Sequence, residues 1–380
     1  MDQGIHLLET KSMVDNRKIL LLGPNTSISL DGRLFFTGAN YYYVLAIIGV
    51  LGHWQPLIIT GIFIIIEFIF YLFFILLLKK IFTATFAITA FLFISLSPYL
   101  VIHSRFFWNP HLLIPLSILT LYFLLQFLHQ KHYRYLFYAA FFWGFAFACH
   151  YSAILWAVIF LFVLIKSHHI HNIKSYLLIG LGLILGNLPL ILFEVRHSFY
   201  NLKTIIYIFT HSPRAGDFTS HYVVFPFLIF SLYFILYLYR KYQLANFLLI
   251  ILFSLLTIIQ LKIFNYYQPL DVIPGWDYST QNHVADLIAQ NCPANFNIAA
   301  TIQGDTRFYD LRYLLDIKNC YSEGVEDYPT SQKLFLVAPV NRPPETETVW
   351  EVSSFKPFII KQKISLNDHL YFYELEKSVK

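Results

Sequence analysis

Long apolar runs separated by short polar segments dominate the chain. A helix needs about 20 apolar residues, within a range of about 17 to 25, to cross the hydrocarbon core of a bilayer. The runs that reach this length cover residues 56–78, 83–101, 111–128, 175–193, 222–239 and 244–264. The pattern predicts a mainly α, polytopic membrane protein.

A longer apolar run, residues 135–165, is interrupted by CHYS at 149–152. The basic segments HQKHYR and KSHHIHNIK precede and follow it. Lys and Arg are enriched in cytoplasmic loops, so both flanks belong on one side of the membrane. Two short spans joined by CHYS satisfy this rule and a single span does not, which brings the prediction to about eight spanning helices.

The same rule orients the remaining loops. Lys and Arg fall in every second loop, at 79–80, 131–134, 166–174 and 240–241, and these loops are predicted to be cytoplasmic. The outer face then carries residues 1–39, SRFFWNPH at 104–111, CHYS and the loop 194–221. The short run NYYYVLAIIGVLG, 40–52, is predicted to be interfacial or re-entrant on that side. An external N-terminus also predicts a first transmembrane helix ahead of Met1, so we expect a multi-pass plasma-membrane protein that lacks this helix here.

Three domains are expected. Residues 1–55 form an outer-face loop with a juxtamembrane helix, 56–264 the helix bundle, and 265–380 a small external α/β domain. In the last domain, DYSTQNHVADLIAQN and DTRFYDLRYLLDI predict helices, and NFNIAATI, QKLFLVAPV and HLYFYELE predict strands.

Composition agrees with a membrane protein. The chain is 57% hydrophobic and only 13% charged, whereas soluble domains have about 25% charged residues. Its net charge of +5 comes from short loop clusters, so nucleic acid is not an expected partner. A bridge between Cys292 and Cys320 is feasible, but three cysteines do not indicate a disulfide scaffold, and we expect these two to be unbridged.

The outer face gathers the candidate functional residues. Arginine at a membrane boundary either snorkels to lipid headgroups or clamps a phosphate. Arg105 and Arg196 lie on a side that basic residues otherwise avoid, which favours the clamp, with His197 beside it. An ionised Asp2 opposite such a clamp would act as a general base or help to hold a divalent cation. This cation is the only cofactor that the sequence suggests, and the sequence does not indicate its other ligands. Further lining is predicted from Asn109, His111, His150 and Tyr151.

Other sequence patterns give weaker indications of function. Glu67 is an acid inside a predicted span, where an acid is a functional candidate but one facing a bundle interior is more often structural. Gly182 and Gly186 form a G-x-x-x-G pattern that predicts close helix packing. The chain contains no G-x-S-x-G, H-E-x-x-H or P-loop motif, so it lacks the usual sequence signals of serine hydrolases, zinc proteases and P-loop ATPases.

The ordered segments DQGIHLLETKSMV, LLLGPNTSI, LFFTGANYYYVLA, SRFFWNPHLLIP, CHYSAI, FEVRHSFYNLK, WDYSTQNHVADLI and LRYLLDI resemble bacterial members of the dolichyl-phosphate-mannose-protein mannosyltransferase-like group. The resemblance implies a GT-C glycosyltransferase fold. It also implies inverting transfer of a hexose or pentose, on the outer face, from a polyprenyl-phosphate donor to a hydroxyl of a protein, lipid or glycan.

The resemblance also implies residue roles. Asp2 stands where the group has its first-loop acid, although Gln3 replaces the second acid that often follows. Arg105 lies in the second outer loop, where NPH replaces an acid found in several relatives. Arg196 and His197 correspond to a basic pair near the donor phosphate.

Two alternatives from other classes remain. A transporter or flippase of lipid-linked sugars would also use an outer basic site, but transporters tend to have two related halves and polar residues at the midplane, and neither pattern stands out here. A non-catalytic membrane assembly protein, binding through the C-terminal domain, is the other alternative.

Overall fold

The computed structural model describes residues 2–96, 107–211, 248, 251–252, 255, 274–302 and 305–378. The chain divides into two compact units, which are described separately below. One comprises Thr10–Ile263 and the other combines Met1–Glu9 with Phe264–Lys380.

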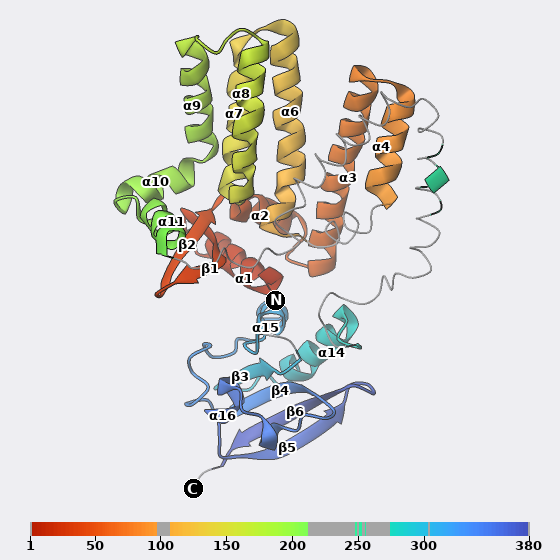
Figure 1. The fold of residues 1–380 in the computed structure, drawn as a ribbon. Helices are drawn as coiled ribbons and strands as arrows, with labels where there is room; N and C mark the ends of the chain where they lie inside the picture. The colour runs from red at the N-terminus through yellow and green to blue at the C-terminus, as the bar shows by residue number, and fades with distance from the viewer. Residues whose placement is uncertain are drawn as a thin grey trace. The chain divides into compact units, whose positions relative to one another are not determined.

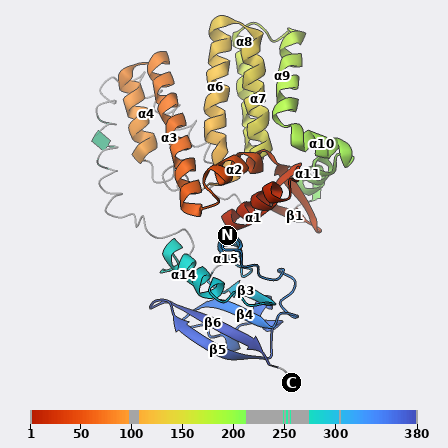
Figure 2. The same cartoon turned by 180° about the vertical axis from the view of Figure 1, so that it is seen from behind.

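The first unit is helical (Figures 1 and 2). Its α-helices are the end of α1 (Asp2–Asp15), α2 (Asn40–Leu51), α3 (Pro56–Ile81), α4 (Ala84–Leu96), α6 (Leu113–Gln130), α7 (Tyr133–Cys149), α8 (Trp156–Lys166), α9 (Ile173–Gly186), α10 (Leu188–Arg196) and α11 (Tyr200–His211). Short 3-10 turns, η1 (Asn109–Leu112) and η2 (Tyr151–Leu155), precede α6 and α8. Helices α6, α7, α8 and α9 lie side by side in both views.

The prediction of about eight spanning helices is wrong for the residues that the structure describes. Two helices there are long and apolar enough to cross a membrane, Pro56–Ile81 and Asn109–Gln130. Helices α9 and α10 would add a third only as one span, and they are bent by 84°. The α7 helix has 17 residues and so rises about 26 Å, against the roughly 30 Å of the hydrocarbon core. The predicted runs 222–239 and 244–264 lie outside the described residues, apart from four isolated positions.

The bend between α9 and α10 has a local cause. Pro189 occupies the first turn of α10, where its missing N–H costs nothing, but proline cannot continue a preceding helix. The predicted single run 175–193 is therefore broken at Asn187, which separates the two helices.

Glycines let α7 and α9 approach each other closely. An added Cβ on Gly182 would lie 2.7 Å from the Phe137 carbonyl oxygen, and one on Gly186 would lie 2.1 Å from that of Phe141. Gly144 of α7 similarly faces the backbone of Leu183 at 2.5 Å. The close packing predicted from the G-x-x-x-G pattern is confirmed.

A β-hairpin in the N-terminal region was not predicted. Strands β1 (Leu22–Leu30) and β2 (Arg33–Gly38) pair antiparallel, and the turn residues Asp31 and Gly32 have φ of 49° and 72°. Two positive φ values characterise a type I′ turn, and Asp-Gly between apolar segments is its usual sequence signal. The signal was present in SLDGRLFF.

The C-terminal unit is built on a mixed sheet with strand order β3-β4-β6-β5. Its elements are α14 (Tyr278–Ala289), β3 (Phe296–Ala300), α15 (Tyr309–Asp316), β4 (Lys333–Pro339), η4 (Pro344–Thr346), α16 (Trp350–Ser353), β5 (Phe358–Ser365) and β6 (Leu370–Lys377). Strands β3 and β4 are parallel, and β6 pairs antiparallel with both β4 and β5. Apolar clusters cover both faces of the sheet, one with α14 and α15 and the other with α16.

The predicted helices and strands of this unit are present, and α14 is capped by Asp277, whose carboxylate accepts a hydrogen bond from the Thr280 N–H at 2.8 Å. Strand β5 was missed because it is an exposed edge strand whose side chains lack a clear apolar face. The expectation of unbridged cysteines is wrong, since Cys292 and Cys320 form a disulfide with a Cα–Cα distance of 5.6 Å. The fold brings the end of α14 against the end of α15, which spacing alone does not reveal.

Candidate functional site at one end of the helices

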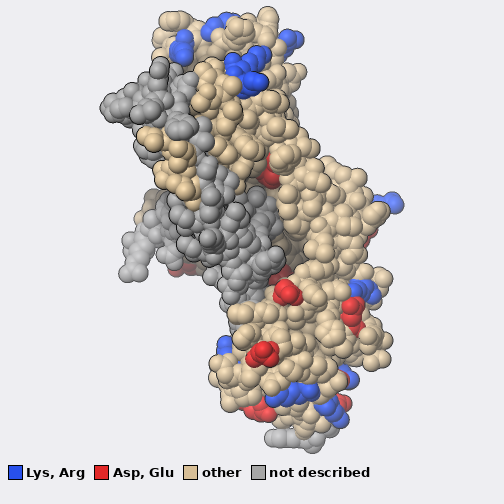
Figure 3. Space-filling view, turned by 90° about the vertical axis from the view of Figure 1, so that its right-hand side faces the viewer, with Lys and Arg blue, Asp and Glu red and all other residues tan. Residues whose placement is uncertain are grey.

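Basic loops meet at one end of the helical unit. Asn172 Nδ2 donates to the Tyr133 hydroxyl at 2.5 Å, and the Lys174 ammonium lies 4.8 Å from the centre of the Tyr133 ring. The loops 131–134 and 166–174, predicted to share one side of the membrane, therefore lie together. On the face seen in Figure 3, Lys and Arg side chains gather at the end of the helices and a broad uncharged surface adjoins them.

The opposite end of α6 and α7 carries the predicted lining residues. Asn109 is 6% exposed, and its Nδ2 donates to the Cys149 carbonyl oxygen at 2.8 Å. His111 is 1% exposed, with its ring 6.1 Å from that of Trp108. The NPH segment is thus held against the CHYS segment, as the predicted topology requires.

His150 and Tyr151 continue this arrangement. The His150 ring nitrogen Nδ1 lies 2.8 Å from the Ser152 hydroxyl and accepts a hydrogen bond from the Ser152 N–H at 3.2 Å. Burial lowers the pKa of His150 to about 4, so the ring is neutral at physiological pH. The Tyr151 hydroxyl donates to the Phe36 carbonyl oxygen at 2.5 Å, which ties CHYS to strand β2.

The Tyr151 hydroxyl stays protonated. Burial raises the pKa of Tyr151 because it disfavours the charged phenolate, and the nearby Glu194 carboxylate raises it further because it repels that negative charge. Tyr151 therefore acts as a hydrogen-bond donor in this network and not as a base.

Asn201 and Glu194 complete the network, and the role of Asn201 was not predicted. The Asn201 side chain makes two hydrogen bonds to the backbone of Phe36. Asn201 Oδ1 accepts from the Phe36 N–H at 3.1 Å, and Asn201 Nδ2 donates to the Phe36 carbonyl oxygen at 3.2 Å. The Glu194 carboxylate accepts hydrogen bonds from the N–H groups of Asn201 and Leu202 at the start of α11. No sequence motif marks Asn201, because its partner is a backbone group in a distant strand.

The other predicted site residues lie outside this network or outside the described part of the chain. Arg196 and His197 are exposed at the end of α10, where the His197 ring stacks on Phe193 at 4.2 Å. Asp2 is the first residue of α1, and its side chain is not described. Arg105 falls outside the described residues. The network therefore unites Asn109, His150 and Tyr151 with Glu194, but the side chains of Arg196 and His197 are not part of it.

The described residues do not assemble a metal site. Over that part of the chain, no group of three or more His, Cys, Asp or Glu side chains is placed to hold an ion. Hard cations such as Mg²⁺ and Ca²⁺ need several oxygen ligands, and such a set is not assembled among the described residues.

The structure thus defines a membrane protein with a few candidate spans, a polar network at one end of its helices and a separate mixed-sheet domain. Residues 40–192 match the family model for dolichyl-phosphate-mannose-protein mannosyltransferase and form a domain of that family. The resemblance predicted from the sequence is confirmed over this segment, which holds α2 to α9 and the Asn109–Tyr151 part of the network. The family implies a glycosyltransferase that depends on a polyprenyl-phosphate sugar. No curated protein and no solved structure matches the chain.

Proposed function

We propose that this protein is an inverting GT-C glycosyltransferase. It transfers a hexose or pentose from a polyprenyl-phosphate donor to a hydroxyl acceptor on the outer face of the plasma membrane. The observation that carries this proposal is the family match over residues 40–192. The hydrogen-bonded network that gathers the predicted outer loops at one end of the helices supports it.

In the proposed mechanism, Arg105, Arg196 and His197 bind the donor phosphate. Negative charge grows on this leaving group as the glycosidic bond breaks, so guanidinium groups positioned on it stabilise the transition state more than the ground state. The exposed guanidinium of Arg196 suits a ligand that arrives from the lipid boundary. Asp2 accepts the acceptor's hydroxyl proton as that oxygen attacks the anomeric carbon.

The network residues have a positioning role in this proposal. The Asn109 amide is committed to a carbonyl oxygen of the CHYS segment, and the Tyr151 hydroxyl is committed to strand β2. These groups hold the loops that surround the donor site and do not themselves contact substrate.

The test reconstitutes the protein in liposomes with a panel of polyprenyl-phosphate sugars and follows the release of polyprenyl phosphate. Asp2→Asn is expected to lower turnover by roughly 10²- to 10⁴-fold, the usual contribution of a general base. The matched control is Asp15→Asn at the other end of α1, where the carboxylate pairs with Lys11 at 2.8 Å; it is expected to retain activity. Full activity in Asp2→Asn would remove the proposed base.

A second pair of variants tests the phosphate clamp. Arg105→Ala is expected to lose turnover, whereas Arg134→Ala, in the first turn of α7, is expected to retain it. Movement of the lipid-linked sugar across the liposome membrane without release of polyprenyl phosphate would favour a flippase over a transferase.

A further inference from the structure

The C-terminal domain has a crevice-forming topology at the carboxyl ends of β3 and β4. These neighbouring strands are parallel. The chain leaves β3 for α15, which packs on one face of the sheet, and leaves β4 for α16, which packs on the other. Connections that diverge to opposite faces leave a crevice outside the strand ends, the usual place for ligands in such sheets.

Two buried polar atoms at this position lack hydrogen-bond partners. Thr301 directly follows β3 and is 4% exposed, and Glu347 follows β4 and is 2% exposed. Within the described chain, neither the Thr301 hydroxyl nor Glu347 Oε1 has a partner. Buried polar groups in proteins are nearly always paired, so both atoms point to a partner that the described residues do not supply.

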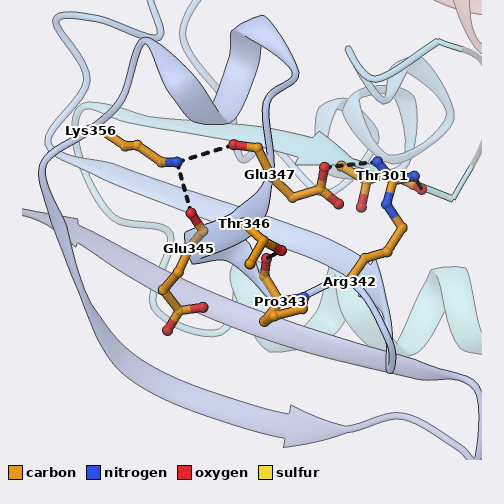
Figure 4. Close-up of polar contacts among 7 residues, drawn as sticks. All are labelled: Thr301, Arg342, Pro343, Glu345, Thr346, Glu347 and Lys356. Atoms are coloured by element: carbon orange, nitrogen blue, oxygen red, sulfur yellow. Dashed lines mark hydrogen bonds and ion pairs between the residues drawn. The ribbon is translucent and has the colours of Figure 1, made fainter.

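Arg342 connects the two residues (Figure 4). Its guanidinium donates to Glu347 Oε2 at 2.9 Å and to the Thr301 carbonyl oxygen at 3.4 Å. The Arg342 side chain is 50% exposed, while that of Glu347 is 2% exposed. Arg342 is therefore the exposed group that links the two buried residues to the surface of the domain.

The loop that carries Arg342 and Glu347 is held in place. Lys356 Nζ donates to the carbonyl oxygens of Glu345 and Glu347, at 2.9 and 3.1 Å. The Thr346 hydroxyl donates to the Pro343 carbonyl oxygen at 2.9 Å. Figure 4 shows these bonds along the same turn. A rigid loop lowers the ordering cost of binding.

The charges at this position select the ligand class. Arg342 and Glu347 neutralise each other. The Glu347 carboxylate would repel a phosphate, and the Arg342 guanidinium would repel an ammonium group. A hydroxyl group both donates and accepts hydrogen bonds, so it can donate to Glu347 Oε1 and accept from Arg342. Trp350, three residues after Glu347, is 46% exposed and offers an aromatic face to apolar C–H groups.

We propose that the crevice at the carboxyl ends of β3 and β4 binds a neutral glycan. Thr301, Arg342 and Glu347 bind its hydroxyl groups, and Trp350 packs against a sugar ring. That this glycan is the acceptor of the transfer rests on the proposed function, whereas its binding does not.

The test applies the full-length protein in nanodiscs to a printed array of neutral and acidic oligosaccharides, followed by titration calorimetry with the best neutral binder. Thr301→Val keeps the side-chain shape and removes a hydroxyl that has no partner. We expect an unchanged or higher melting temperature together with an increase in Kd on the order of tenfold. Trp350→Ala is expected to weaken binding by a similar factor.

The matched control is Thr330→Val, close to the amino end of β4, where the hydroxyl donates to the Asp327 carbonyl oxygen at 3.0 Å. It removes a hydrogen bond that is made, and we expect an unchanged Kd. Binding confined to acidic oligosaccharides, no binding on the array, or an unchanged Kd in Thr301→Val would overturn the inference. Glycan binding without transfer from any polyprenyl-phosphate donor would instead overturn the proposed function and leave the glycan site standing.

Discussion

The two units of this protein satisfy their polar side chains in different ways. In the helical unit, Asn109, Tyr151 and Asn201 bond to backbone groups freed at helix ends and strand edges. In the C-terminal unit, ion pairs are more common among the described residues, as between Lys333 and Glu374 at 2.6 Å and between Lys318 and Asp286 at 2.7 Å, whereas the helical unit has the pair of Lys11 with Asp15. Hydrocarbon offers no hydrogen bonds, so a membrane unit must satisfy its backbone internally, whereas a domain in water tolerates ions at its surface.

Apolar side chains show the same contrast. Helix α3 exposes large apolar residues such as Phe68, Ile69 and Leu72, as a helix facing lipid does. The C-terminal unit encloses its aromatic residues, among them Trp276 at 1% and Phe372 at 3% exposure. The surroundings of each unit therefore determine whether its large apolar side chains are exposed or enclosed. Four predictions test how far the two units differ.

The largest expected effect comes from Arg312 in the C-terminal unit. This residue is 9% exposed, and its guanidinium donates to Asn297 Oδ1, the Ser322 and Tyr328 hydroxyls, and the carbonyl oxygens of Arg307 and Glu323. Arg312→Met removes all of these donated hydrogen bonds from a largely buried position and is expected to lower the free energy of unfolding by about 3–5 kcal/mol. Urea titration followed by hydrogen exchange in β3 measures it.

Arg312→Lys sharpens this test. Lysine keeps the charge but lacks the planar five-donor geometry, so it is expected to restore little of the lost stability. Exchange in the helices of the other unit should not change. Full rescue by lysine would show that charge, and not the hydrogen-bond pattern, is what Arg312 provides.

Removing the disulfide is expected to have the next largest effect. Cys292 and Cys320 are 28 residues apart, and closing a loop of this length stabilises a fold by about 3–4 kcal/mol through the entropy of the unfolded chain. The double variant to Ala should melt earlier in the C-terminal unit alone. Melting curves with and without reductant should coincide for the variant and differ for the wild type.

The third prediction concerns the glycine contact in the helical unit. Gly182→Val places a side chain where the α7 backbone lies and is expected to cost about 1–3 kcal/mol through overpacking. Gly180→Val on the same helix is the control, because nothing lies within 4 Å of its added Cβ. Thermal denaturation in detergent distinguishes them; equal losses would mean that valine's helix propensity, and not packing, sets the cost.

The smallest effect is a pH dependence at His150. Its pKa is lowered by burial from 6.5 to about 4, so the unfolded chain binds a proton that the folded protein does not bind between these values. Stability should therefore fall as the pH drops from about 6.5 to about 4 and level off below. Near neutrality the effect is small, under about 1 kcal/mol between pH 7 and pH 6.

His150→Asn removes the titrating group and keeps a side chain able to cap η2. Its melting temperature should vary less with pH over this range than that of the wild type. His197→Asn, at the exposed end of α10, is the matched control and should keep the wild-type pH profile. A His150→Asn profile identical to wild type would show that the burial of His150 does not contribute.

The sequence located the elements whose signal is local. Apolar length alone placed the candidate spans at Pro56–Ile81 and Asn109–Gln130, and short-range patterns placed α14, β3, β4 and β6. Motif order also identified the family segment. For the site, the sequence selected Asn109, His150 and Tyr151 from their predicted shared face, but the roles of Asp2, Arg105, Arg196 and His197 remain predictions.

Tertiary structure decided the features that depend on distant partners. The disulfide and the contacts of Asn201 and Tyr151 with Phe36 join segments far apart in the chain. Many of these partners are backbone carbonyl oxygens, which every residue carries, so no residue type marks them in advance. The unpaired atoms of Thr301 and Glu347 were hidden for the same reason, because burial without a partner is a property of the fold and not of the sequence.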